Sequence, residues 1–371
     1  MPEPTDAELE AEVRLAMVRG VGPRLRQNLA AAFGDAASVL AQPASQLQRV
    51  DGIGGKLADR IAAATEEIDA AGEVRRAAER GITIVTPRRP GYPRTLEEIP
   101  DPPAVLYLKG DALPADQLAV AIVGTRHATR YGLQNAERLA AGLARAGVTV
   151  VSGMARGIDT AAHRGALEAG GRTIAVLAGG LLKPYPPENA GLALEIAAQG
   201  CVMSEAPLLR PPFSGAFPQR NRVISGLSLG TIVVQAADRS GALITAHHAA
   251  EQGREVFAVP GPVDCRLSRG CHSLIQQGAK LVTDVEDVLE ELGPLVEGVP
   301  LAGGGELRHV AELDLNEVEH AVLQSIEASP TLIDTVVQSS GVPVHRVLST
   351  LSVLEMRGLV RRVGGAMVAR V

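Results

Sequence analysis

The sequence predicts an α/β protein whose largest part is a Rossmann-like, doubly wound and mostly parallel sheet, with a helical module before it and a winged helix after it. Two observations predict the sheet of the central part. Short, fully apolar segments recur between residues 119 and 259, and amphipathic segments of helical length separate them. Strands that are covered on both faces read as continuous apolar runs, so this alternation indicates a parallel sheet between two helical layers.

The sequence predicts a helical module over residues 1–75, in which one short motif occurs twice. GVGPRLRQNLAAAFG begins at Gly20 and GIGGKLADRIAAA begins at Gly52. Each phrase is Gly-apolar-Gly, then a basic residue, then an amphipathic run, which resembles a SAM-like or helix-hairpin-helix module. The glycines permit a tight turn and leave backbone N–H groups at the start of the next helix, where a DNA phosphate can bind. A purely structural packing role is equally compatible with so short a pattern.

Residues 76–292 predict the extended Rossmann-like domain. Its strands are expected at GITIVTP, PAVLYLKG, AVAIVG, VTVVSG, RTIAVLAGG, CVMSE, TIVVQA and EVFAVPG. In such domains ligands bind beyond the carboxyl ends of the strands, so the loops that follow these segments are where a site is expected.

Residues 293–312 are rich in Gly and Pro and predict a linker. Residues 313–371 follow a winged-helix plan, with VPVHRVLSTLSVLEMRG as the recognition-type helix and VRRVGGAMVARV as the wing. Binding of double-stranded DNA and plain protein interaction are both open for this domain.

Composition limits the class of protein. The 371 residues suffice for two or three domains, and the net charge of −6 argues against a polycation that coats nucleic acid. The charge is uneven, however, because Arg recurs in loop after loop between residues 126 and 222, so a local basic site is compatible with an acidic chain.

No membrane association or metal site is expected from the sequence. The first residues are acidic and lack the apolar region of a signal peptide, and no apolar run approaches the roughly 20 residues that span a bilayer. Three cysteines favour a cytoplasmic protein. Cys265, Cys271 and His272 match no common zinc spacing.

The candidate site is a set of glycines, hydroxyls, amides, aromatic rings and basic side chains on the loops after the strands. Its members are Gly124, Thr125, Arg126, Ser152, Gly153, Arg156, Gly180, Lys183, Tyr185, Asn189, Phe217, Arg220, Asn221, Arg222 and Ser240. Together with helix N-termini, such groups bind oxyanions, most simply phosphates. The competing interpretation for any single Arg is a solvated side chain or an ion pair with Asp159 or Glu205. The agreement of five loops favours the site.

Catalytic groups and cofactor motifs are not evident on these loops. The first apolar strand is followed by Thr125-Arg126 rather than by Gly-x-Gly-x-x-Gly, and no Walker phosphate loop occurs. Gly226 to Gly230 spells a nucleophile-elbow pattern, but a helix precedes it and a strand follows, the reverse of an elbow, so Ser228 is discounted. His163, four residues after Asp159, is expected to form a structural pair with it. The chain is therefore expected to be neither an enzyme nor a cofactor binder.

Several phosphate-sized pockets in a row fit a polymer of phosphates, that is, single-stranded nucleic acid. Tyr185, Phe213 and Phe217 fall on the candidate loops and could stack on bases. Anchoring of the loops in the core is the alternative role for each ring.

The ordered motifs of residues 80–290 closely resemble the DNA processing protein A (DprA/Smf) family. They are IVGTR, VSGMARGIDTAAH, YPPEN, SEAP, FPQRNRVISGLS, SGALITAHHAAEQGREVFAVPG and GCHSLIQQGAKLV. The resemblance implies a cytoplasmic, non-enzymatic single-stranded DNA binder that dimerises through the Rossmann domain, protects incoming DNA during natural transformation and loads the recombinase RecA onto it.

The resemblance also assigns residues. The family's Gly-Ser-Arg falls on Gly124, Thr125 and Arg126, with Arg126 as the principal phosphate contact; its Ser-Gly motif falls on residues 152–159 and its Arg-Asn-Arg on residues 220–222. Some members carry a Lys that contacts DNA directly after Tyr-Pro, where this chain has Pro187-Glu188. Lys183 is a candidate substitute. Residues 178–182 also lack the family's usual Asp.

An enzymatic alternative remains at this point. Rossmann-fold hydrolases of the lysine-decarboxylase-like group process nucleoside monophosphates and carry Pro-Gly-Gly-x-Gly-Thr-x-x-Glu. This chain has SGALITAHHAAEQG at the comparable turn, with Glu251 on the helix but without Gly-Gly-x-Gly-Thr. A transcriptional regulator that acts through the winged helix is the third reading, weakened by the short wing.

Overall fold

The computed structural model describes residues 6–87, 89–300, 306–327, 329–364 and 366–371. They form two compact units, Met1–Val285 and Glu286–Val371, and each is described by itself. The first unit ends at Val285, where α15 (Val285–Leu292) begins, whereas the sequence places the domain boundary at residues 292/293.

The first unit is built on one nine-stranded sheet, ordered β1-β2-β6-β5-β4-β3-β7-β8-β9. Its strands are β1 (Ile82–Val85), β2 (Leu106–Gly110), β3 (Ala119–Val123), β4 (Thr149–Ser152), β5 (Thr173–Val176), β6 (Cys201–Ser204), β7 (Gly230–Val233), β8 (Glu255–Ala258) and β9 (Lys280–Leu281). Strands β3 to β9 run parallel to one another. Strand β2 pairs antiparallel with β6, and β1 pairs antiparallel with β2. The predicted doubly wound sheet is confirmed.

The order of the strands fixes the place of a site. From the central β3 the chain winds outward through β4, β5 and β6, and it then returns to pair β7 on the other side of β3. The direction of winding changes between β3 and β7, so the loops that leave the carboxyl ends of these two strands lead to opposite faces of the sheet and open a crevice there.

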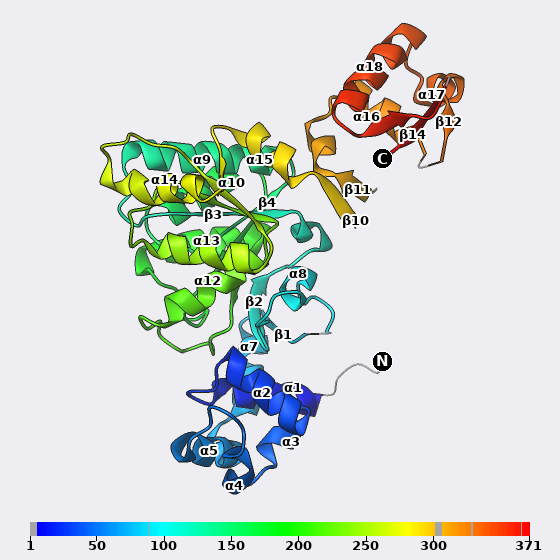
Figure 1. Ribbon diagram of the computed structural model, residues 1–371. Coiled ribbons are helices and arrows are strands. Elements are labelled where there is room, and N and C mark those ends of the chain that lie inside the picture. Colours follow the sequence, from blue (N-terminus) through cyan, green and yellow to red (C-terminus); the bar gives the residue numbers. More distant parts are fainter. Residues whose placement is uncertain (1–5, 88, 301–305, 328, 365) are drawn as a thin grey trace. The chain divides into compact units, whose positions relative to one another are not determined.

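Helices cover both faces of this sheet (Figure 1). They are α8 (Arg94–Glu97), α9 (Arg130–Arg145), α10 (Ile158–Glu168), α11 (Ala190–Gln199), α12 (Ala216–Gly226), α13 (Gly241–Glu251) and α14 (Arg269–Gln276), with the 3₁₀ turn η2 (Pro187–Asn189) before α11. Figure 1 shows α9 and α10 on one side of β3 and β4 and shows α12 and α13 on the other.

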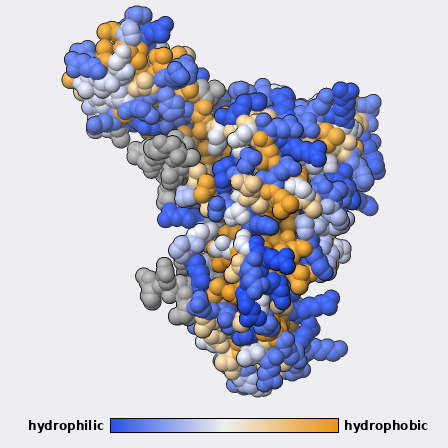
Figure 2. All heavy atoms as spheres, turned by 180° about the vertical axis from the view of Figure 1, so that it is seen from behind, coloured by the Kyte–Doolittle hydropathy of each residue, from blue (hydrophilic) through white to orange (hydrophobic). Residues whose placement is uncertain are grey.

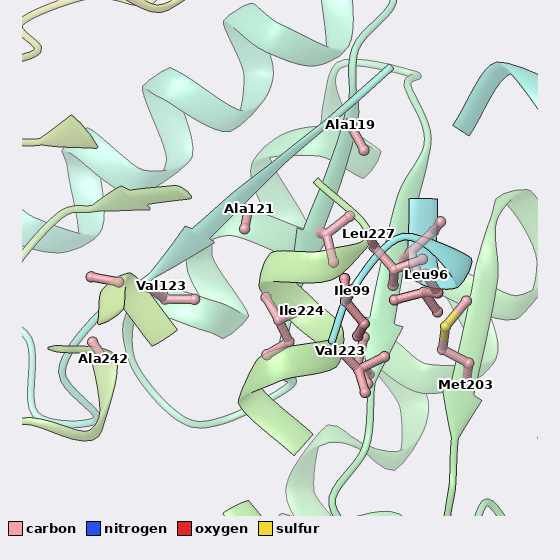
Figure 3. Packing of buried hydrophobic residues seen from close by; sticks show 14 of the residues in the cluster. Leu96, Ile99, Ala119, Ala121, Val123, Met203, Val223, Ile224, Leu227 and Ala242 are labelled. Atoms are coloured by element: carbon pink, nitrogen blue, oxygen red, sulfur yellow. The ribbon is translucent and has the colours of Figure 1, made fainter. Parts of the chain in front are cut away.

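The core is small-residue and aliphatic, as a chain with 2% aromatic residues requires. Figure 3 shows one cluster, in which Val223 and Ile224 of α12 and Leu227, the residue after this helix, lie with Leu96 and Ile99 beside the sheet. All five side chains are at most 4% exposed. Helix α12 is thus anchored along one face, which fixes the direction of its remaining side chains.

The N-terminal module consists of α1 (Asp6–Met17), α2 (Pro23–Phe33), α3 (Ala36–Leu40), α4 (Ala44–Leu47), α5 (Gly55–Ala62), α6 (Ala64–Glu67) and α7 (Ala70–Glu79). The predicted boundary at residue 75 falls inside α7. The module is part of the first unit because Val13 packs in one cluster with Leu177 and Leu208, and Arg210 Nη2 donates to the Met17 carbonyl over 3.1 Å.

The second unit contains a two-stranded sheet and a winged helix. Its elements are β10 (Pro294–Pro300), β11 (Glu306–His309), η4 (Val310–Asp314), α16 (Glu317–Gln324), β12 (Thr331–Leu332), α17 (Ile333–Ser340), α18 (Val344–Met356), β13 (Val360–Arg362) and β14 (Met367–Arg370). The predicted linker is thus partly strand. Residues 301–305 of that linker and Gly365 of the wing lie outside the described residues.

The surface is mixed in polarity. Figure 2 shows hydrophilic residues over much of one face, with apolar residues in smaller groups between them. Among the described residues, no helix combines the length and the apolar character that crossing a bilayer requires.

Candidate nucleic-acid interface

The loop after β3 is tied to its neighbours by the backbone. Thr125 N donates to the Gln235 carbonyl at the end of β7 over 2.7 Å, and Gln235 Oε1 accepts from Thr129 N over 2.9 Å. Gly157 has φ of 77°, and a Cβ there would lie 2.4 Å from the Thr125 carbonyl oxygen. Only glycine permits this approach, which brings the loops after β3 and β4 together.

Two hollows open beside each other at this edge of the sheet. The switch-point hollow is lined by residues that include Gly124, Thr125, Arg126, Asp159, Phe217, Arg220, Asn221 and Ser240. The aromatic hollow is lined by residues that include Arg126, Gly153, Arg156, Gly179, Tyr185, Phe217 and Arg220. Arg126, Phe217 and Arg220 belong to both, so they form the wall between the hollows.

Arg126 is held over an aromatic ring at this wall. Its guanidinium carbon lies 4.7 Å from the centroid of the Phe217 ring, and Tyr185 meets Phe217 edge-on with centroids 6.0 Å apart and planes at 66°. A cation over a ring face is attracted by its quadrupole, which orients the guanidinium without consuming its N–H donors. Arg126 is exposed and Tyr185 is 40% exposed, so both can meet a ligand.

Arg220 lies inside α12, not on a loop, and only 6% of it is exposed. Its Nη1 donates to the Val176 carbonyl over 2.6 Å, and its charge lies near the buried carboxyl of Asp159. Burial raises the pKa of Asp159, and Arg220 opposes that rise. Arg220 therefore compensates a buried acid as well as lining the hollows.

Gly153 makes room for Arg220. A Cβ at Gly153 would lie 1.9 Å from Arg220 Nη1, which is an overlap. We expect Gly153→Ala to lower the free energy of unfolding by about 1–3 kcal/mol, because a packed buried group must shift. Urea denaturation measures this loss. Gly241→Ala is the matched control on the same edge, where no atom lies within 4 Å of the added Cβ; equal stability of the two variants would contradict the role of Gly153.

Asn221 and Arg222 also lie inside α12, which corrects the expectation of a loop. Asn221 Nδ2 donates to the Gly241 carbonyl over 3.2 Å at the start of α13, and Asn221 lines the switch-point hollow. Arg222 points elsewhere: Nη2 pairs with Glu205 at 2.6 Å, Nε pairs with Asp101 at 2.9 Å, and neither of the two hollows includes it. The ion pair with Glu205 is the alternative that the sequence had left open.

Three other candidates are buried and shape the loops from within. Ser152 Oγ donates to the Ile122 carbonyl over 2.6 Å. A Cβ at Gly180 would lie 2.1 Å from the Pro207 carbonyl oxygen, so this glycine permits close packing of two loops. Asn189 Nδ2 donates to the carbonyl of Met154, whose φ of 61° is rare for a residue with a side chain.

The remaining candidates lie at the margin. Ser240 caps α13, with its hydroxyl accepting from Ala242 N over 3.3 Å, and it lines the switch-point hollow. Arg156 is exposed, but Glu188 pairs with its Nε and holds the pKa of the guanidinium above its ordinary value. Lys183 is exposed and lines neither of the two hollows.

The histidine and the acid that the sequence singled out, His163 and Glu251, lie apart from the two hollows. His163 Nδ1 lies 2.7 Å from Thr173 Oγ1, so its partner is Thr173 rather than the expected Asp159, and burial lowers the pKa of His163 to about 3. The side chain of Glu251, the residue of the hydrolase alternative, is 72% exposed and contacts His248. The described residues contain no cluster of three or more His, Cys, Asp or Glu side chains that could hold a metal.

Gln235 is an important residue that the sequence reasoning missed. It is 2% exposed at the end of β7 and binds both Thr129 and the loop after β3. The signal was available, because a polar residue at the end of the apolar run TIVVQA needs a partner when it is buried.

Comparison with known proteins decides the family. Residues 83–293 match the family of the DNA recombination-mediator protein A, residues 308–366 match the DprA winged helix domain, and residues 12–67 match a SAM-like helix-hairpin-helix tandem. The chain belongs to the DNA processing protein A (DprA/Smf) family, a family of DNA recombination mediators.

Individual relatives agree with this assignment. Protein Smf of Synechocystis is 34% identical over 94% of this chain and 96% of its own length. The X-ray structure of DNA processing protein A from Streptococcus pneumoniae superposes with a TM-score of 0.67 at 35% identity, over 78% of this chain and 98% of that one. The structure of DNA processing protein A from Helicobacter pylori, which is described as giving insights into its unique single-stranded DNA binding mode, has a TM-score of 0.52 at 32% identity. The match covers 57% of this chain and 95% of that one.

Proposed function

We propose that this protein binds single-stranded DNA across the wall between the switch-point and aromatic hollows. The observation that carries this proposal is the exposed guanidinium of Arg126, held 4.7 Å above the Phe217 ring at the crevice where the strand order reverses. A guanidinium donates two parallel hydrogen bonds to a phosphate, and exposed rings give bases a surface on which to stack.

The surroundings of Arg126 favour a strand over a single small ligand. The hollows lie side by side, Tyr185 is exposed in one, and the N-terminus of α13 with its Ser240 cap opens into the other. A helix N-terminus attracts a phosphate through its free N–H groups. The Helicobacter pylori relative is described as binding single-stranded DNA, which agrees with this proposal.

The family suggests the cellular role. We propose that the chain acts in the cytoplasm as a homodimer through its Rossmann domain, protects incoming single strands in natural transformation and loads RecA onto them. Membership of a recombination-mediator family supports this role. A strand-exchange assay tests it: the protein should accelerate exchange by RecA on strands already covered by a competing single-strand binder, and an unchanged rate would remove RecA loading from the proposal.

Binding itself is tested by fluorescence anisotropy. Labelled oligo-dT and its duplex counterpart are titrated with the full-length protein over a series of salt concentrations. We expect tighter binding of the single strand, with affinity that falls steeply as salt rises because phosphate contacts release counterions. Equal or tighter binding of the duplex would shift the DNA site to the winged helix, and no binding of the single strand at low salt would overturn the proposal.

Glu188 is expected to weaken binding by occupying Arg156. Both side chains of this pair are about half exposed, and the Arg156 hydrogen bond lowers the pKa of Glu188, so the pair is ionised near neutral pH. Glu188→Gln should raise affinity for oligo-dT and steepen the salt dependence by about 0.7 in log–log slope, the value for one further phosphate contact. Glu195→Gln, on α11, is the control. An unchanged slope would exclude Arg156 from the phosphate path.

A further inference from the structure

A third hollow lies within the first unit, between the central sheet and the first hairpin of the N-terminal module, which is the turn that joins α1 to α2. The module contributes Val21, Gly22, Pro23 and Arg26 to its lining. The central domain contributes residues from the ends of β5 and β6, the loop before α12, and α12 itself, including Glu205, Arg210, Phe213, Arg220 and Arg222. We call it the hairpin hollow. Arg220 also lines the two hollows described above, so all three adjoin.

Arginine dominates the charge of this hollow. Arg26, Arg210, Arg220 and Arg222 line it against the single carboxylate of Glu205. Other carboxylates neutralise part of this charge from outside the lining: Glu12 pairs with Arg26, Asp101 pairs with Arg222, and Asp159 lies near Arg220. Glu12 and Asp101 are 30% and 38% exposed and stay hydrated, whereas the side chains of Arg26 and Arg222 are 13% and 3% exposed.

Two of these arginines keep a buried donor without a partner. Arg222 is 3% exposed and its Nη1 makes no hydrogen bond; Arg220 is 6% exposed and its Nε makes none. A buried charged group that leaves a donor unsatisfied costs free energy, and a bound acceptor would recover it. Burial also lowers the pKa of Arg26 to about 10, and the charge of Glu205 opposes that decrease, so little water reaches this guanidinium.

The start of α2 faces the same hollow. Gly22 caps this 11-residue helix without a side-chain hydrogen bond, and Pro23 follows at the first position. The positive end of the helix dipole is therefore unoccupied by any side chain of its own, in a hollow that already contains arginine donors.

The two hairpins of the module differ at one position that matters here. Aligning GVGPRLR with GIGGKLA places Arg26 opposite Ala58, which is fully buried in the core of the module. The first hairpin thus carries a guanidinium where the second carries a methyl group. Among the hollows described, only the hairpin hollow includes Arg26, so the charge belongs to the face that meets the central domain.

We propose that the hairpin hollow binds a phosphate group, held by Arg26, Arg210 and the start of α2, and that this phosphate comes from a strand already bound at Arg126. The source of the phosphate rests on the proposed function; the phosphate site itself does not. A strand that leaves the aromatic hollow past Arg220 reaches the hairpin hollow next, so the N-terminal module lengthens the DNA path.

The first arm of the test uses inorganic phosphate and the full-length protein. Thermal unfolding is followed in phosphate and in chloride at equal ionic strength, for the wild type, Arg26→Gln, Arg210→Gln and the control Lys56→Gln. Lys56 stands at the position of the second hairpin that corresponds to Arg24 and is exposed. We expect phosphate to stabilise the wild type and Lys56→Gln, with affinity about tenfold weaker in the other two variants, the effect of losing one charge-assisted hydrogen bond.

The second arm uses oligo-dT of increasing length with the same proteins. We expect Arg26→Gln and Arg210→Gln to bind short strands as the wild type does, and to lose affinity and about 0.7 of salt slope each once the strand is long enough to reach the hollow. Arg126→Ala should weaken binding at every length. Two variants on different elements keep the test valid if one of them fails to fold.

The outcomes separate the two proposals. Equal stabilisation by phosphate in the wild type, Arg26→Gln and Arg210→Gln overturns the site, whatever the oligonucleotides do. A phosphate effect that depends on Arg26, with no change for any strand, confirms the site and overturns the strand as its source. A wild type that binds no single strand refutes the proposed function, while the phosphate arm still decides the site.

Discussion

Arg220→Ala is expected to lower the free energy of unfolding by about 3–5 kcal/mol near neutral pH, because it removes the charge that compensates the buried carboxyl of Asp159. Arg220 is 6% exposed and Asp159 is 5% exposed, so water cannot replace the lost guanidinium. Arg239→Ala, an exposed position on the same edge of the sheet, should cost little. Urea denaturation of both variants measures the difference.

The loss should depend on pH in a defined direction. Burial already raises the pKa of Asp159, and Arg220 counteracts that rise, so its removal raises this pKa further. A group whose pKa is raised on folding stabilises the folded state when it is protonated and loses that contribution as pH rises. The destabilisation by Arg220→Ala should therefore shrink as pH falls toward the raised pKa of Asp159. A loss that is independent of pH would show that packing, not charge, is the role of Arg220.

Arg126→Ala is expected to weaken binding of oligo-dT by about tenfold or more and to reduce the salt slope by about 0.7, because one charge-assisted phosphate contact is lost. Arg126 is exposed and contacts the Phe217 ring, so the melting temperature should stay near that of the wild type. Fluorescence anisotropy and thermal unfolding give the two readings.

Arg145→Ala provides the control for Arg126→Ala. Arg145 is exposed in the last turn of α9, and this helix runs from the loop after β3 to the loop before β4, so Arg145 lies at the opposite edge of the sheet. It should bind DNA as the wild type does. Equal losses in both variants would mean that net charge, not a site at Arg126, governs binding.

The fold could be predicted from the sequence because its signals are local. Apolar runs such as AVAIVG and TIVVQA specify buried parallel strands, and the Gly-terminated amphipathic segments between them specify the covering helices. The linker predicted at residues 293–312 contains the short antiparallel pair that β10 and β11 form, which a high content of Gly and Pro does not exclude.

The location of the candidate site could be predicted from the sequence, but the roles of its individual residues could not. The alternation of strands and helices alone places the loops at one edge of the sheet. The sequence does not indicate which Arg is exposed to solvent. Arg126 is exposed, whereas Arg222 is buried between Glu205 and Asp101, which lie 17 and 121 positions earlier in the chain. Pro218 lies in the first turn of α12, where Pro is tolerated, and therefore indicates a nearby helix N-terminus.

Photo-crosslinking tests the central claim most directly, because it reports where the strand lies. An oligo-dT in which 5-iodouracil replaces thymine is bound to the full-length protein, irradiated, and the crosslinked peptides are identified by mass spectrometry. We predict crosslinks at Tyr185 and Phe217, whose rings meet Arg126 at the wall between the hollows. Crosslinks confined to the winged helix, with neither ring modified, would contradict the claim that single-stranded DNA binds at the carboxyl ends of the strands.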